Sequence, residues 1–187
     1  GTDATGHSGA GNGVFGVRVD RGATENIIGT NGDGTTDAAE RNVISGNGAD
    51  GVVIASSGTD RNVVAGNFVG TDATGQMALG NGRYGVLIAG GAQFNRIGTD
   101  ANELADVAEG NLVSGNLRSG VAILNAGSSE NVVSGNHIGT DLTGTLPVAN
   151  QAHGVLIGGG STSNLIGTDG DGVADHLERN IISGNSV

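Results

Sequence analysis

Short segments in which aliphatic residues occupy every second position recur along the whole chain. The pattern Gly-Val-x-[Ile/Val] begins about every 35 residues, at Gly16, Gly51, Gly85, Gly120 and Gly154. A period of two predicts β-strands, because successive side chains of a strand point to opposite faces. The residues expected to face the core are Val17 and Val19, Val52 and Ile54, Val86 and Ile88, Val121 and Ile123, and Val155 and Ile157. The residues expected to point outward are Arg18, Val53, Leu87, Ala122 and Leu156.

A second pattern, Asn-x-[Ile/Val], occurs twice after each of these segments and predicts two more short strands per interval. One series begins at Asn26, Asn62, Asn95, Asn131 and Asn164, and the other at Asn42, Asn67, Asn111, Asn136 and Asn180. Strands this short are stable only if each pairs with its copy in the next turn of a stack. The asparagine side chains would then hydrogen-bond along the stack in ladders. The alternative is that they serve only local turns.

A longer repeat contains the shorter one. The motif Gly-Thr-Asp-x-Thr-Gly begins at Gly1, Gly70 and Gly139. The chain therefore divides into the units 1–69, 70–138 and 139–187, of which the first two each hold two three-strand turns. We predict an all-β chain, a single domain over 1–187, folded as a right-handed parallel β-helix (β-solenoid) of about five coils with a 69-residue double-coil repeat. We also expect it to be a segment of a longer array.

Composition narrows the chemistry that this fold can carry. Aromatic residues make up only 2% of the chain and cysteine is absent, so Val, Ile and Leu must form the core. The net charge of −11 includes no lysine. Such a surface repels phosphate backbones and attracts divalent cations, which argues against nucleic-acid partners. No apolar run is long enough for a membrane helix, so membrane insertion is not expected either.

Several runs resemble a known repeat. Asn-Val-Ile-Ser-Gly-Asn at 42–47, Gly-Val-Val-Ile at 51–54 and Asn-Leu-Val-Ser-Gly-Asn at 111–116 are similar to the parallel β-helix repeat of pectate-lyase-like proteins, alginate epimerases and large bacterial surface proteins. The resemblance covers the whole chain and implies the fold. It leaves the function open, because that fold carries enzymes, adhesins and passive stalks. The acidic, histidine and arginine stretches that mark the enzymes are absent.

The strongest chemical pattern lies in the long connections Gly29–Arg41, Gly98–Gly110 and Gly167–Arg179. The spacing Asp-x-Asp-Gly-x-x-Asp-x-x-Glu is similar to the later part of EF-hand and thrombospondin type 3 calcium loops, in which carboxylates surround a hard cation. The candidate calcium ligands are Asn31, Asp33, Asp37, Glu40, Asp100, Asn102, Asp106, Glu109, Asp169, Asp171, Asp175 and Glu178. The middle copy lacks the glycine, and we expect it to bind more weakly.

Each candidate has a purely structural alternative. Asp37 with Glu40, and the matching pairs in the other two loops, fit a capping box that opens one helical turn. The Thr-Asp pairs of the Gly-Thr-Asp-x-Thr-Gly motif are explained by local turns. Phe15, Tyr84 and His153 stand in equivalent positions of the three units, where such rings pack on a sheet or, as the alternative, stack on sugars.

These observations favour a non-enzymatic, structural or adhesive β-solenoid segment of a secreted or cell-surface bacterial protein, stiffened by calcium. The expected partners are neighbouring solenoid coils, of the same or another chain, with a polysaccharide as a further candidate. A catalytic site requires one turn to differ from its neighbours, whereas these loops repeat. Two alternatives stay open: a polysaccharide-binding or polysaccharide-processing β-helix with its active turn elsewhere, and a subunit that forms filaments through its ends.

Overall fold

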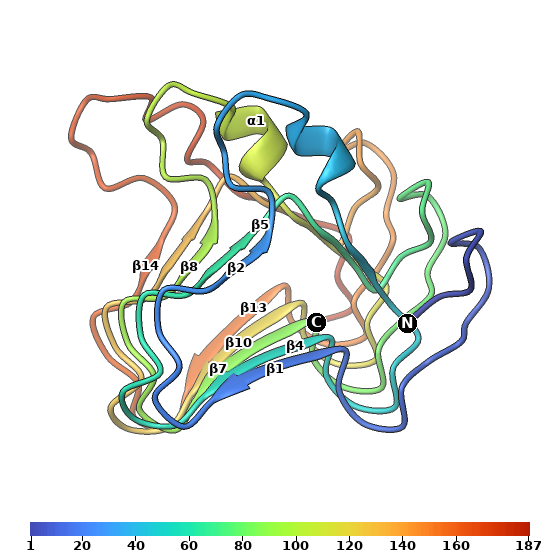
Figure 1. The fold of residues 1–187 in the computed structure, drawn as a ribbon, viewed down its shortest axis with the longest axis horizontal. Helices are drawn as coiled ribbons and strands as arrows, with labels where there is room; N and C mark the ends of the chain where they lie inside the picture. The colour runs from blue at the N-terminus through green and yellow to red at the C-terminus, as the bar shows by residue number, and fades with distance from the viewer.

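The computed structural model describes residues 1–187 and contains three parallel sheets of five strands each. In every sheet each strand pairs with the equivalent strand of the next coil, so the chain makes about four full turns between its first and last strands. Figure 1 looks nearly along the axis, and the chain turns clockwise as it recedes from the blue N-terminal coil. The predicted all-β, right-handed parallel β-helix is therefore confirmed.

The three sheets are built from the three predicted strand types. The first contains β1 (Val17–Asp20), β4 (Val52–Ala55), β7 (Val86–Ala89), β10 (Val121–Leu124) and β13 (Val155–Gly158). The second contains β2 (Ile27–Gly29), β5 (Val63–Ala65), β8 (Arg96–Gly98), β11 (Val132–Ser134) and β14 (Leu165–Ile166). The third contains β3 (Val43–Ile44), β6 (Phe68–Val69), β9 (Leu112–Val113), β12 (His137–Ile138) and β15 (Ile181–Ile182). Only two helical turns are present, η1 (Asp37–Ala39) and α1 (Asp106–Glu109).

The core is one continuous column of aliphatic side chains between the three sheets. Ile54, Ile88 and Ile123 are aligned in successive coils and have no exposed surface. Residues of the opposite face lie outside this column: Arg18 is exposed and Leu87 is half-buried. Burial of a side chain this size contributes about 1.5–3 kcal/mol, so the stacked column is the main source of stability. The predicted inward face is therefore confirmed in the middle coils, whereas Ile157 in the last coil is exposed. Val53 and Ala122, which were expected to point outward, lie outside the column but are buried.

Asparagine ladders run along the corners of the solenoid. Both predicted series form: each side-chain amide donates to the side-chain oxygen of the next member, as from Asn62 to Asn95 at 3.1 Å and from Asn111 to Asn136 at 2.9 Å. The structure adds a third ladder that the sequence analysis missed. Its members are Asn12, Asn47, Asn81, Asn116, Asn150 and Asn185. These ladders satisfy backbone groups at the corners, where no strand pairing is available.

The motif Gly-Thr-Asp-x-Thr-Gly forms a local turn, as predicted. The Asp72 carboxylate accepts hydrogen bonds from the Thr74 hydroxyl at 2.8 Å and from the backbone amides of Gln76 and Met77 at 3.2 Å. Burial opposes ionisation of Asp72, but these donors and His7 outweigh it and hold its pKa below the ordinary value. Among the rings in equivalent positions of the three units, that of Tyr84 is buried, which fits packing on the sheet.

Candidate cation-binding loops

Three acidic loops leave the solenoid at the same corner, each between a strand of the second sheet and a strand of the third. We call residues 29–41 the first, 98–110 the middle and 167–179 the last acidic loop. They lie together above the upper corner in Figure 1. A coil with a short link separates successive loops, and the link donates its amide to the loop beyond it, as from Gly66 to the Glu109 carbonyl at 2.7 Å. The acidic loops therefore stack along the axis.

A glutamate closes each acidic loop at its base. Its carboxylate accepts a hydrogen bond from the backbone amide nine residues earlier. The pairs are Glu40 with Asn31 at 3.0 Å, Glu109 with Asp100 at 2.9 Å, and Glu178 with Asp169 at 3.0 Å. The structure thus brings together the first and last candidate ligands of every loop. Charge-assisted bonds of this kind are stronger than neutral ones.

A threonine forms a second clasp that the sequence analysis missed. The Thr30 hydroxyl donates to Asp37 at 2.6 Å, Thr99 to Asp106 at 2.6 Å, and Thr168 to Asp175 at 3.1 Å. The signal was present in the sequence, since a threonine follows the first glycine of all three loops. The clasp holds the third candidate ligand of each loop in place.

The capping-box alternative is wrong for the first and middle loops. The residues that precede the two helical turns are Thr36 and Ala105, both left-handed, and neither turn has a side-chain cap. Glu40 bonds to Asn31, outside the turn, and not to the amide of Asp37. Glu40 and Glu109 therefore accept hydrogen bonds at the base of their loops, from the backbone amides of Asn31 and Asp100, and not within the helical turns.

In the last acidic loop, three carboxylates converge. One oxygen each from Asp169, Asp171 and Asp175 lies within 4.8 Å of the others. Asp169 and Asp171 are exposed, and none of the three forms an ion pair with a basic side chain. Backbone amides orient them, including that of Val173 to Asp171 at 2.7 Å. Glu178 is not part of this cluster.

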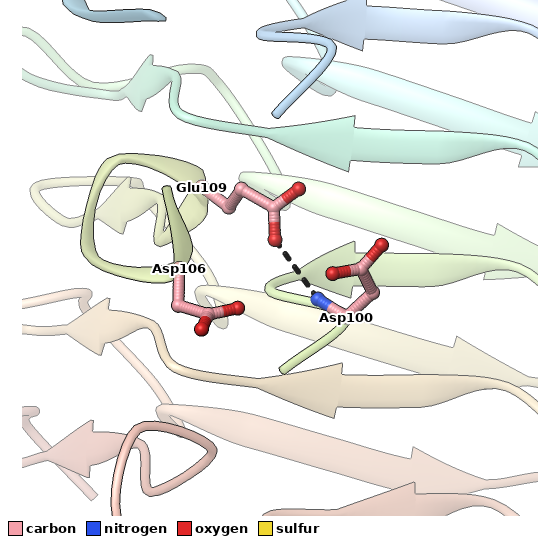
Figure 2. Close-up of side chains that lie close together, drawn as sticks. All are labelled: Asp100, Asp106 and Glu109. Atoms are coloured by element: carbon pink, nitrogen blue, oxygen red, sulfur yellow. Dashed lines mark hydrogen bonds between the residues drawn. The ribbon is translucent and has the colours of Figure 1, made fainter. Parts of the chain in front are cut away.

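In the middle acidic loop a different set of three carboxylates converges, those of Asp100, Asp106 and Glu109 (Figure 2). Asp106 is 4% and Glu109 1% exposed. One oxygen of Asp106, Oδ2, is buried and has no hydrogen-bond partner. Burial raises the pKa of Glu109 above its ordinary value, against the opposing effects of the Asp100 amide and the Arg96 charge. Asn102 is outside the cluster and orients the Leu104 amide instead.

The first acidic loop has fewer carboxylates close together. Asn31 takes the place of Asp100 and Asp169, and its side-chain amide donates to Asp33 at 3.2 Å. Asp33 in turn accepts the Thr35 amide at 2.8 Å. Asp37 is nearly buried and is held by the threonine clasp. An ion here would use one amide oxygen in addition to the carboxylates, a set that calcium accepts.

A cavity of about 440 Å³ lies on the outer side of the third sheet, between the middle and last acidic loops. His137 forms part of its lining with His176 and Arg179. His137 interrupts the repeat at this place, because the position equivalent to it is Leu112 in the adjacent coil and Phe68 in an earlier one. This cavity was not predicted, since His137 occupies the variable position of an Asn-x-[Ile/Val] segment and is distant in sequence from His176 and Arg179.

In comparisons with known proteins, no family model, curated protein or solved structure matches this chain. The resemblance to pectate-lyase-like repeats is therefore supported at the level of the parallel β-solenoid and no further. None of the helices has the length and apolar character needed to cross a membrane.

Proposed function

We propose that this chain is a non-enzymatic, calcium-stiffened structural segment of a secreted or cell-surface protein. The observation that carries the proposal is the convergence of carboxylates in the last acidic loop, repeated at the same corner in the middle loop. The rest of the chain is regular: a continuous core, ladders of asparagine and sheets in register. A scaffold of this kind presents or spaces other parts of a protein, and its natural neighbours are further solenoid coils.

Calcium suits these loops because of their ligand type and charge. Carboxylate and amide oxygens are the ligands that hard divalent cations prefer. Three carboxylate oxygens within 4.8 Å repel one another in the last loop, and the chain as a whole carries −11. A bound divalent ion would turn this repulsion into attraction and stiffen a loop whose residues 168–173 are all exposed. Extracellular calcium-binding modules of moderate affinity are saturated with calcium outside cells, which fits the proposed location.

Thermal unfolding with calcium or with chelator tests this proposal. An ion bound only by the native state stabilises it by about 2.7 kcal/mol at a hundredfold excess over Kd. We expect the calcium-dependent rise in Tm to shrink in Asp171→Asn and to be retained in Glu130→Gln, which removes an exposed charge outside the loops. Equal Tm values with calcium and with chelator would refute calcium binding and leave the loops as hydrogen-bonded connections.

The cavity at His137 supports a second candidate, the binding of a polysaccharide. It provides two histidines and an arginine, donors suited to sugar hydroxyls or carboxylates, at a place where the repeat is broken. His137→Phe would restore the residue type found at Phe68 and fill the cavity. We expect this variant to lose NMR shift changes caused by an acidic oligosaccharide. If the wild-type chain shows no such shifts, this candidate is excluded.

A further inference from the structure

We propose that the Arg96 guanidinium is the cation of the middle acidic loop and prevents this loop from binding calcium. This inference rests on the proposed function, that the acidic loops bind calcium, and restricts the binding to the first and last loops. It identifies a single residue in a β-strand as the determinant of calcium stoichiometry.

Arg96 reaches the residues that would hold an ion. One guanidinium nitrogen lies 3.2 Å from Oε2 of Glu109, and the other lies 3.6 Å from Oδ2 of Asp100. The first also donates to the Gly98 carbonyl at 2.7 Å, which fixes the side chain under the loop. Two of the three converging carboxylates are thus paired with a cation that belongs to the chain itself.

The position of Arg96 in its sheet is otherwise aliphatic. The residues in register with it through the five coils are Ile27, Val63, Val132 and Leu165. Ile27 and Leu165 are the residues below the first and last acidic loops, so neither of those loops has a basic side chain at this place. Its side chain is only 21% exposed, so the charge is held against the loop and not in solvent.

The middle loop nevertheless keeps the arrangement of a cation site. Asp106 belongs to the converging cluster and is only 4% exposed, and one of its oxygens, Oδ2, is buried without a hydrogen-bond partner. The guanidinium contacts Asp100 and Glu109 but not Asp106, and its shape explains this: a planar fork pairs two carboxylates, whereas a spherical ion can bind three. Without Arg96, the three carboxylates would form an uncompensated, largely buried ligand set.

Calcium stoichiometry tests the inference directly. We expect equilibrium dialysis of chelator-treated protein to give two bound ions per chain for the wild type and three for Arg96→Leu. This substitution gives the strand below the middle loop the leucine that Leu165 provides below the last loop. Arg96→Gln removes the charge but keeps a hydrogen-bond donor, and we expect three ions here as well if the leucine variant does not fold. Arg118→Leu, an exposed arginine away from the acidic loops, should remain at two.

The outcomes separate this inference from the proposed function. Three ions on the wild type, or two on both Arg96 variants, would overturn the role of Arg96 and leave calcium binding intact. No ion on the wild type but one on the variants would support Arg96 and refute binding by the first and last loops. No ion on any chain would overturn both.

Discussion

Replacing Asn95 by alanine tests whether the asparagine ladders stabilise the solenoid. The Asn95 side chain has no exposed surface. Its amide group donates to Oδ1 of Asn131 and the Gln93 carbonyl at 3.0 Å, and to the Thr59 carbonyl at 3.1 Å. Its Oδ1 accepts the backbone and side-chain amides of Asn62 at 2.9 and 3.1 Å. The substitution breaks the ladder in its middle and leaves these groups buried without partners.

The expected cost follows from these contacts. A hydrogen bond contributes about 1 kcal/mol net. The two N–H groups of Asn95, shared among three acceptors, count as about two full bonds, and its Oδ1 accepts two more. The loss of Asn95 should therefore lower the free energy of unfolding by about 4 kcal/mol. Asn26 is the matched control, since it is the exposed first member of the same ladder and donates to Asn62 without accepting from a further member. Asn26→Ala should cost about 1 kcal/mol.

Urea unfolding followed by far-UV circular dichroism is the appropriate assay, because the chain has no tryptophan. The midpoint should fall strongly for Asn95→Ala and slightly for Asn26→Ala, with the slope m unchanged. Equal losses for the two variants, or a loss below about 1 kcal/mol at Asn95, would refute the idea that ladder bonds stabilise the fold. A lower m would show instead that the coils unfold separately, as solenoid repeats can.

Three further predictions concern the core, the loop stack and the turns. Ile88→Asp buries an unpaired charge and should abolish cooperative unfolding, whereas Leu87→Asp, on the outer face, should remain folded. Gly32→Ala should lower Tm by several degrees, because Gly32 has φ +71° and a Cβ there would collide with Oε1 of Glu109. Asp72→Asn should remove part of the acid sensitivity: the lowered pKa of Asp72 stabilises the fold above its ordinary value of 3.8, and this contribution disappears as pH falls through the folded pKa.

Each of these predictions has a clear contrary outcome. A soluble, cooperatively unfolding Ile88→Asp chain would show that the inward face is misassigned. A Gly32→Ala chain with unchanged Tm would mean that the first and middle loops are not in contact. Parallel acid-unfolding curves for wild type and Asp72→Asn would show that the turn does not favour the ionised carboxylate.

Much of the fold could be predicted from local pattern, while part of each site could not. The third asparagine ladder repeats with the same 69-residue period as the other two, yet Asn47 and Asn81 lack the Ile or Val two positions later that marks the predicted strands. The capping boxes were wrong for a related reason. Asp37 and Glu40 have the correct spacing, but the glutamate has a choice of donors, and only the folded loop brings the Asn31 amide within reach.

The sequence by itself determined the coil length, the three strands of each coil, their register and the face that is buried. It could do so because all four depend on residues within one period, and because a shift of one residue would turn the aliphatic side chains outward. Only the tertiary structure decided that Arg96 meets Glu109, that Glu109 lies against Gly32, and that a cavity opens at His137. These contacts join loops of different length from different coils, where the polar side chains have several possible partners and no repeated pattern selects among them.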